Sequence, residues 1–239
     1  MPRTAARTPR RDDSLSRDRI VDAAIALLDR DGEDGLTFRA LSEELATGAG
    51  AIYWHVANKS ELLTAACDAV VARTLDGLAS GGAPAAAIRT LALALFDTID
   101  RHPWIGSALT QAPGQQPTVR ILERLGQPLL ALGVPTKRQW PTVFALMSYV
   151  LGVAGQNAAN AQLARRAHGG AGREVFIDAL ATAWSQLDPA AWPFTRGIAA
   201  QFRTHDDRAD FLAGVDLILA GIASAPAAAP ARARVARKG

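Results

Sequence analysis

Residues 36–45, LTFRALSEEL, and residues 53–60, YWHVANKS, decide the fold of this chain. The first stretch is an amphipathic segment of about two helical turns that begins at a natural cap, Thr37. The second ends a helix of small residues with two aromatics and a histidine, and an Asn-Lys-Ser-Glu helix start follows at once. Two short helices joined by a turn of three or four residues form a helix-turn-helix. The pattern therefore predicts a DNA-binding motif.

Composition favours an all-α protein. The chain has 239 residues, of which 49% are hydrophobic and 6% aromatic, so it has enough apolar material for a sizeable core. Alanine and leucine are abundant, and the alternation of β-branched residues that marks strands is scarce. We expect either one large helical domain or two smaller ones.

The basic character of the chain resides in its two ends. The pI is about 9.5, but residues 1–11 and residues 225–239 each hold four basic residues and no acidic one. Without these eight, 18 basic side chains face 23 acidic ones. Such tails either contact DNA phosphates or only keep the protein in solution, so the pI does not by itself identify a nucleic-acid-binding protein.

Several kinds of site and location are disfavoured by the sequence. A single cysteine, Cys67, rules out an internal disulfide and a cysteine-based zinc site, and it is predicted to be a small buried residue of a helix. We expect no metal and no cofactor. The chain opens with arginines and prolines, and its longest apolar run, residues 143–155, is shorter than a membrane span. We therefore expect a cytoplasmic protein without a membrane partner.

The chain is predicted to divide at a cluster of glycine and proline, residues 80–84. Before it, a helix over 15–30 capped by Ser14 or Ser16 ends at residues 31–35, and another runs from Asn58 to Leu78 with Glu61 completing a capping box. The division is a disordered basic arm (1–13), a helix-turn-helix DNA-binding domain (14–78), a helical effector-binding and dimerisation domain (84–223) and a disordered basic tail (224–239). In the larger domain we predict helices at 85–101, 103–110, 117–132, 137–167, 172–186 and 207–223, with Pro189, Pro193 and Gly197 as interruptions.

The first helix of the motif offers two contacts to DNA. Thr37 points a hydroxyl or an amide at a phosphate, or is only the cap of its helix. Arg39 either pairs with guanine O6 and N7 or contacts a phosphate.

The second helix begins with Gly48, Ala49, Gly50 and Ala51, a poor helix start in water. Small residues at this point let the helix end approach base edges, although a frayed surface turn is the alternative. Beyond them, Tyr53, His55 and Lys59 suit phosphates, and Trp54 either packs inside or lies in the groove. Ile52 and Val56 are expected to face the core.

Residues 16–64 resemble the DNA-binding domain of the TetR family of bacterial repressors. The likeness rests on Tyr53-Trp54-His55-Val56 with Asn58-Lys59, which is similar to tetracycline repressors, and on residues 20–24 and 35–37. Residues 101–103 and 211–219 also look like C-terminal parts of such members. The resemblance implies phosphate contacts for Thr37, Tyr53, His55 and Lys59, and approach to bases for Arg39, Ala49, Gly50, Ala51 and Trp54. One departure is Ala46-Thr47 in the inter-helix turn, where the family has glycine, because alanine disfavours positive φ.

The resemblance also implies a homodimer joined by two helices from each subunit. Candidate contact residues are Ser148, Gly152, Gly155 and Ala159 on one helix, and Phe211, Gly214, Ile218 and Gly221 on another. Packing within one subunit is the alternative for these stripes. A two-fold dimer matches an inverted-repeat operator on double-stranded DNA.

A ligand cavity is expected from the family in the C-terminal part. Candidate lining residues are His102, Trp104, Trp140, Phe144, Met147, Tyr149, Asn157, Phe176 and Trp184. Aromatic residues at helical spacing are more often ordinary core, and His102 alternatively caps its helix. No second histidine follows His102 where a magnesium–tetracycline complex needs one, so we do not expect that effector.

The sequence thus predicts a DNA-binding transcriptional regulator, a homodimeric repressor released by an unknown small molecule. A DNA-binding dimer without an effector is the first alternative, and the sequence does not separate the two. A helical enzyme is the second, but the sequence has no Ser/His/Asp arrangement, glycine-rich phosphate loop or metal-ligand spacing. We do not expect an enzyme.

Overall fold

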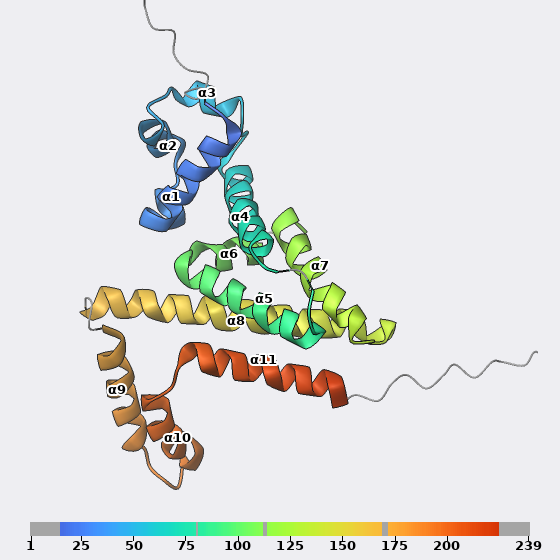
Figure 1. Ribbon diagram of the computed structural model, residues 1–239. Helices are drawn as coiled ribbons and strands as arrows, with labels where there is room; N and C mark the ends of the chain where they lie inside the picture. The colour runs from blue at the N-terminus through green and yellow to red at the C-terminus, as the bar shows by residue number, and fades with distance from the viewer. Residues whose placement is uncertain (1–14, 80, 112–113, 169–171, 225–239) are drawn as a thin grey trace, which may run out of the picture.

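The computed structural model describes residues 15–79, 81–111, 114–168 and 172–224, and within them the chain is helical without strands (Figure 1). The all-α prediction is therefore confirmed. The predicted arm at 1–13 and almost all of the tail at 224–239 lie outside the described residues. The helices are α1 (Arg17–Gly35), α2 (Phe38–Glu44), α3 (Ala49–Tyr53), α4 (Lys59–Asp76), α5 (Pro84–Arg101), α6 (Trp104–Gln111), α7 (Gln116–Ala131), α8 (Thr136–His168), α9 (Gly172–Ser185), α10 (Pro193–Arg203) and α11 (Asp207–Ser224).

The first helix begins as predicted and runs past its predicted end. Ser16 caps α1, accepting a hydrogen bond from the Arg19 backbone N–H at 3.3 Å. Gly32 interrupts the helical backbone with φ 72°, a conformation that is free of steric cost in glycine. One further turn leads to Gly35 before α2 starts.

The turn between α2 and α3 keeps its geometry with alanine where a glycine was expected. Ala46 has φ 49° and is the one described non-glycine residue with positive φ. The Ala46 N–H donates to the Glu43 carbonyl at 3.3 Å, and the Thr47 N–H donates to the Ser42 carbonyl at 3.0 Å. These two bonds make a Schellman ending of α2, in which Ala46 takes the left-handed position.

The start of α4 is capped from both sides. The Asn58 side chain accepts from the Glu61 N–H at 2.8 Å, as the capping box predicts. In return, the Glu61 carboxylate accepts from the Ala57 N–H at 2.9 Å, one residue earlier than the box predicts. Two backbone donors at this helix start are therefore satisfied by side chains.

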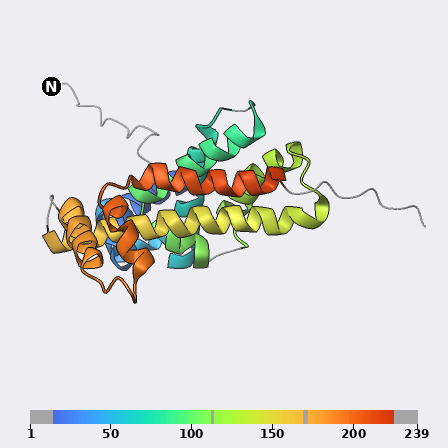
Figure 2. The same cartoon turned by 90° about the horizontal axis from the view of Figure 1, so that it is seen from below.

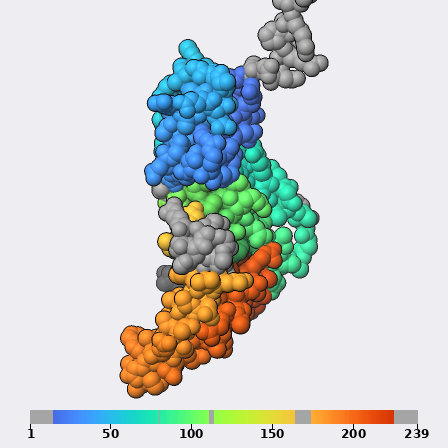
Figure 3. All heavy atoms as spheres, turned by 90° about the vertical axis from the view of Figure 1, so that its left-hand side faces the viewer, coloured from blue at the N-terminus to red at the C-terminus, as the bar shows by residue number. Residues whose placement is uncertain are grey.

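The molecule is elongated, with the N-terminal helices at one end and α9 and α10 at the other (Figures 1 and 3). Helix α4 leads from the small helices α1–α3 into the body formed by α5, α6, α7, α8 and α11. One continuous apolar core extends from α1 to α11 and includes Ile20, Leu95 and Leu146. The buried residues of α9 and α10, such as Ile177 and Ala199, lie outside that core.

Helix α10 was not predicted. Pro189, Pro193 and Gly197 led us to expect only interruptions there, but Pro193 is the first residue of α10. Proline is tolerated at the first helical position because the N–H that it lacks has no partner there, and its fixed φ suits a helix. The remaining predicted helices are present, each within a few residues of its predicted bounds.

Helices α8 and α11 lie side by side along one face of the body (Figure 2). Tyr149 of α8 lies across α11, stacks on Phe211 with ring centroids 5.6 Å apart, and donates its hydroxyl to the Phe211 carbonyl at 3.0 Å. A side chain at Gly214 would overlap the Tyr149 ring. Gly214 is therefore required for this close approach of the two helices. None of the helices in the described part of the chain has the length and apolar character needed to cross a membrane.

Candidate nucleic-acid interface and ligand pocket

The start of α3 is an open surface made of small residues. Gly48, Ala49 and Gly50 are exposed, and a Cβ built on Gly48 or Gly50 meets no other atom within 4 Å. Ile52 and Val56 are buried, which confirms that this helix has one core face and one free face. A backbone without bulky side chains at a helix N-terminus is suited to close approach to a nucleic acid.

Two aromatic side chains stand beside that surface. Tyr53 is exposed and stacks on Phe38 of α2, with ring centroids 4.3 Å apart and planes at 13°. This stacking holds the Tyr53 ring in place while its hydroxyl stays accessible. Trp54 is 90% exposed, so of the two alternatives for Trp54 the packed one is wrong. His55 is half-buried.

The remaining predicted contact residues lie around α3 on neighbouring helix starts. Thr37 caps α2, accepting from the Ala40 N–H at 3.1 Å. The exposed Arg39 forms an ion pair with Glu43, at 3.0 Å between Nε and Oε1. The Lys59 ammonium donates to the Glu33 carbonyl at 2.5 Å. Each cation thus has a partner within the chain, which DNA phosphates or bases would have to replace or share.

His102 and Trp104 form a joint between the N-terminal helices and the body. The Asp29 carboxylate of α1 is 2.7 Å from His102 Nδ1 and accepts from the Trp104 indole N–H, also at 2.7 Å. Trp104 is buried. His102 Nδ1 and Trp104 Nε1 are both engaged with Asp29, so these two side chains join the two parts of the chain.

Of the other predicted ligand residues, Tyr149 and Asn157 line a small pocket of about 180 Å³ between α8 and α11. Phe144 stacks on Trp140 at an exposed surface of α8. Asn157 donates to Asp100 at 3.2 Å, whereas Tyr149 packs on α11. The Trp184 ring lies against Phe202 between α9 and α10, with centroids 4.5 Å apart and planes tilted by 34°. Phe176 is also on α9 and exposed, and Met147 is half-buried on α8. The predicted ligand residues are therefore spread over several helices in this structure, because helical periodicity identifies a face without saying which faces meet.

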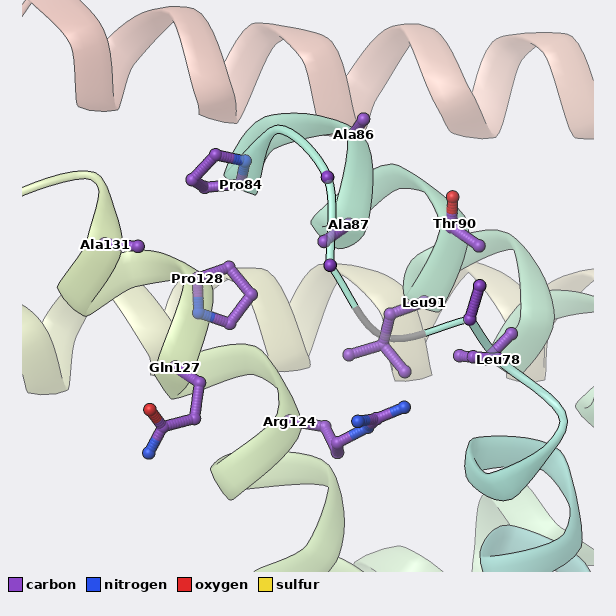
Figure 4. Close-up of a pocket in the computed structure, with 13 residues that line it drawn as sticks. Leu78, Pro84, Ala86, Ala87, Thr90, Leu91, Arg124, Gln127, Pro128 and Ala131 are labelled. Atoms are coloured by element: carbon purple, nitrogen blue, oxygen red, sulfur yellow. The ribbon is translucent and has the colours of Figure 1, made fainter.

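A pocket of about 390 Å³ lies instead where α4 ends and α5 begins (Figure 4). Most of its wall is apolar, with polar groups from α7 and from Thr90 of α5. The lining residues are Leu78, Ala79, Gly81, Gly82, Pro84, Ala86, Ala87, Thr90, Leu91, Arg124, Gln127, Pro128 and Ala131. The only sequence signal for this place was the glycine and proline cluster at 80–84, which predicted a boundary. Its wall from α7 had no such signal.

The outer face of α8 and α11 carries large apolar side chains in the open. Trp140 and Phe144 of α8 and Leu217 of α11 are exposed, and Ser148, Gly152, Ala159 and Gly221 are also at the surface. The rest of the predicted stripes is used within the chain. Phe211 is only 1% exposed, Gly214 faces Tyr149, Gly155 lies against Gly106 of α6, and Ile218 is half-buried. For Phe211 and Gly214 the alternative of internal packing is correct, whereas a Cβ built on Gly155 would meet no neighbour within 4 Å.

Neither a metal site nor a reactive thiol stands out in the described residues. No three His, Cys, Asp or Glu side chains are grouped there closely enough to hold a metal ion. Cys67 is buried in α4, as predicted, and burial raises the pKa of its thiol to about 12. The thiol therefore stays protonated and unreactive at neutral pH.

Comparison with known proteins agrees with the geometry of α1–α4. Residues 20–66 match the family model described as bacterial regulatory proteins, tetR family. A solved transcriptional regulator from Streptomyces coelicolor, a TetR, is 50% identical over 88% of this chain and 98% of its own, with a TM-score of 0.79. The chain belongs to the TetR family. It is a DNA-binding transcriptional regulator.

Two further relatives show how much of the chain the similarity spans. The class D tetracycline repressor of Escherichia coli is 44% identical, but over only 26% of this chain and 28% of its own length. The ActR protein of Streptomyces coelicolor, solved in complex with actinorhodin, is 26% identical over 87% of this chain and 95% of its own, with a TM-score of 0.72. The matches span between 28 and 53% of the length of the first curated relatives, so the C-terminal part of this TetR-family chain is compared mainly through solved structures.

Proposed function

We propose that this TetR-family regulator is a homodimeric repressor that a small-molecule effector releases from a palindromic operator. In this proposal residues 14–78 bind DNA, and residues 84–223 bind the effector and the partner subunit. The observation that carries it is the open, small-residue start of α3, flanked by the exposed Tyr53 and Trp54. Support for an effector comes from the pocket at the end of α4 and from the similarity to ActR.

The proposed dimer uses the outer face of α8 and α11. Trp140 and Phe144, which stack on each other, and Leu217 of α11 expose apolar side chains to water in a single chain, and large exposed apolar areas on soluble proteins mark interaction sites. Leu217 is 75% exposed, and Leu217→Asp is expected to shift the sedimentation coefficient from dimer to monomer. Leu130→Asp, a half-exposed leucine on α7, is the control. A monomeric wild-type protein at micromolar concentration would contradict the proposal.

Operator recognition is tested by selecting binding sites from random duplex DNA. We expect enrichment of an inverted repeat whose half-sites are about one turn, roughly 34 Å, apart or a multiple of that distance. Arg39→Ala should cost about 1–3 kcal/mol on the selected operator and much less on random DNA, because Arg39 is assigned to base edges. Selection that yields no inverted repeat would rule out the palindromic operator.

Lys59 supplies the matched control because it is assigned to a phosphate. Lys59→Ala should weaken binding to all sequences alike and reduce the slope of log K against log salt by about one. The uncharged Tyr53 makes the complementary case, since Tyr53→Ala should weaken binding to all sequences with little change in that slope. An unchanged slope in the Lys59 variant would remove this residue from the interface.

The effector part of the proposal separates it from a DNA-binding dimer without effector. Coupling between sites is reciprocal, so an effector that weakens operator binding must itself bind more weakly to the DNA complex, by the same factor. Titration of a ligand with and without saturating operator measures both factors. Equal affinities for a ligand of the pocket would favour the alternative.

A further inference from the structure

The pocket at the end of α4 combines an apolar wall with one cation. Leu78, Leu91 and Pro128 contribute apolar surface, and the Arg124 side chain extends from α7 beneath Leu91 toward Leu78 (Figure 4). A second pocket of about 420 Å³ adjoins on the other side and is also lined by Leu78 and Arg124. Arg124 is thus the cation that the two pockets share, and the second pocket is also lined by Arg120, Asp76 and Glu123.

Arg124 at present holds the last turn of α4. Its Nη2 donates to the Leu75 carbonyl at 2.9 Å, and the same carbonyl accepts from the Leu78 N–H at 3.2 Å. A cation at this point is favourable because the C-terminal end of a helix carries partial negative charge. The bond joins α7 to the helix that carries the N-terminal domain.

The half-buried Arg124 is hydrogen-bonded to a neutral carbonyl, whereas the nearby Arg120 is paired with a carboxylate. Arg120, one helical turn earlier, is paired with the Asp68 carboxylate at 2.7 Å. Over the described part of the chain, no carboxylate lies within ion-pair distance of Arg124. A guanidinium has five N–H donors in a planar fork, and a carboxylate satisfies two of them at once. The site therefore has capacity for an anion.

From these contacts we infer that the pocket takes an amphipathic carboxylic acid, and that its carboxylate draws Arg124 away from the Leu75 carbonyl. The apolar body of the acid lies between Leu78, Leu91 and Pro128, and its carboxylate forms a bidentate pair with the guanidinium. Two parallel bonds from the guanidinium to a carboxylate are stronger than its single bond to a neutral carbonyl. This inference rests on the proposed function, since it names the effector class of the same site.

The exchange of partners gives the acid a way to weaken operator binding. When Arg124 leaves Leu75, the last turn of α4 loses its tie to α7 and a favourable charge at its end. The acid then binds better to a conformation in which α4 is displaced than to the one with the tie intact. Such a difference in affinity between two conformations is what an effector needs to shift their populations.

Acids and their neutral amides test the recognition step. Calorimetric titration of the full chain with benzoate, 2-naphthoate and decanoate, each beside its primary amide, should show at least one acid that binds about tenfold more tightly than its amide. Inorganic phosphate should bind far more weakly, because it lacks the apolar body. Equal binding of acid and amide, no binding by any acid at millimolar concentration, or phosphate binding as tight as the acid would overturn the inference.

Variants of Arg124 test the residue. In Arg124→Gln the preference for acid over amide should fall below about twofold, and in Arg124→Lys it should be intermediate. Arg138→Gln, which lines a different cavity near α11, should keep the full preference. A preference that survives in Arg124→Gln excludes this residue. If circular dichroism shows that Arg124→Gln is unfolded, the Lys variant and the wild-type comparison decide.

Operator binding separates this inference from the proposed function. The tightest acid should raise the operator dissociation constant of wild-type protein by about five- to a hundredfold, and its amide should not. If the ligand-free protein binds no DNA sequence specifically, the proposed function is refuted, and binding of the acid to the pocket still stands. An operator complex that no tested acid weakens would leave the proposed DNA binding intact and overturn the role of Arg124 in release.

Discussion

Ala46 occupies a backbone position that glycine fills more easily. With φ 49° its Cβ is close to the neighbouring carbonyl oxygen, which costs an L-residue about 1–2 kcal/mol. The side chain is exposed, so its removal loses no packing. We expect Ala46→Gly to stabilise the protein by about 1 kcal/mol in urea unfolding, with unchanged operator affinity.

The control for this variant is the same exchange in ordinary helix. Ala26 is an exposed residue inside α1, where Ala26→Gly should cost about 1 kcal/mol. If both exchanges destabilise the protein, the turn between α2 and α3 is not in the left-handed conformation in solution.

At the scale of elements, the start of α4 links stability to pH. The Ala57 N–H bond, ahead of the ion pair with Arg17, lowers the pKa of the Glu61 carboxyl below its usual 4.5. A depressed pKa contributes stability that is complete above the unfolded value and is lost as the pH falls through the folded value. The melting temperature of Glu61→Gln should therefore lie below that of wild type at pH 7, and the two should converge below about pH 4.

Asn58→Ala provides the comparison because it removes the other half of the cap without removing a titrating group. It should lower stability by about 1 kcal/mol at every pH. If the Glu61→Gln and wild-type curves run parallel down to pH 3, the carboxylate of Glu61 is not what the Ala57 backbone binds.

How far the elements could be predicted from the sequence depended on the kind of signal. Caps such as Ser16, Thr37 and Asn58 are local, since side chain and backbone partner are three residues apart, and all three were predicted. Pro193 was misread because proline interrupts a helix in its middle and suits its first turn, and only the residues after the proline distinguish the two cases. After Pro193, the residues Phe194, Ile198 and Phe202 repeat every four positions, which is a helical spacing.

At the scale of the whole molecule, Asp29 ties the N-terminal helices to the body. Removing its carboxylate leaves the buried Trp104 N–H without an acceptor, which costs about 1–3 kcal/mol. We expect Asp29→Ala to lower the free energy of unfolding by that amount, as measured by urea titration. Asp29→Asn keeps an oxygen acceptor and should cost less.

A surface carboxylate on the same helix provides the control for the loss of unfolding free energy in Asp29→Ala. Asp22 pairs with Arg73 in the open, where such pairs contribute less than about 1 kcal/mol. Asp22→Ala should thus be nearly neutral, and a loss equal to that of Asp29→Ala would show that the joint has no special role.

The candidate DNA contacts were easier to identify than the ligand pocket for a physical reason. Arg39, Tyr53 and Lys59 lie within one continuous stretch, so local spacing places them together. The pocket joins the end of α4 to α7, and Arg124 meets Leu75 across 49 positions. Phe176 and Trp184 lie on α9, away from that pocket, and the sequence could not show this because an apolar face does not identify the helix on which it packs. Pairing of distant helices is set by the packing of the whole core.

Helices α9 and α10 lie outside the common core, and we expect them to unfold locally before the rest of the protein. In the described part of the chain these helices pack mainly on each other and, through α9, on α8, and their buried residues form no part of the main core. Little apolar surface holds them, so they make a unit whose opening requires less than global unfolding. Amide protons of α9 and α10 should exchange with deuterium well before those of α5, and proteases should first cleave at residues 186–192. A protein that loses this hairpin would keep the rest of its fold.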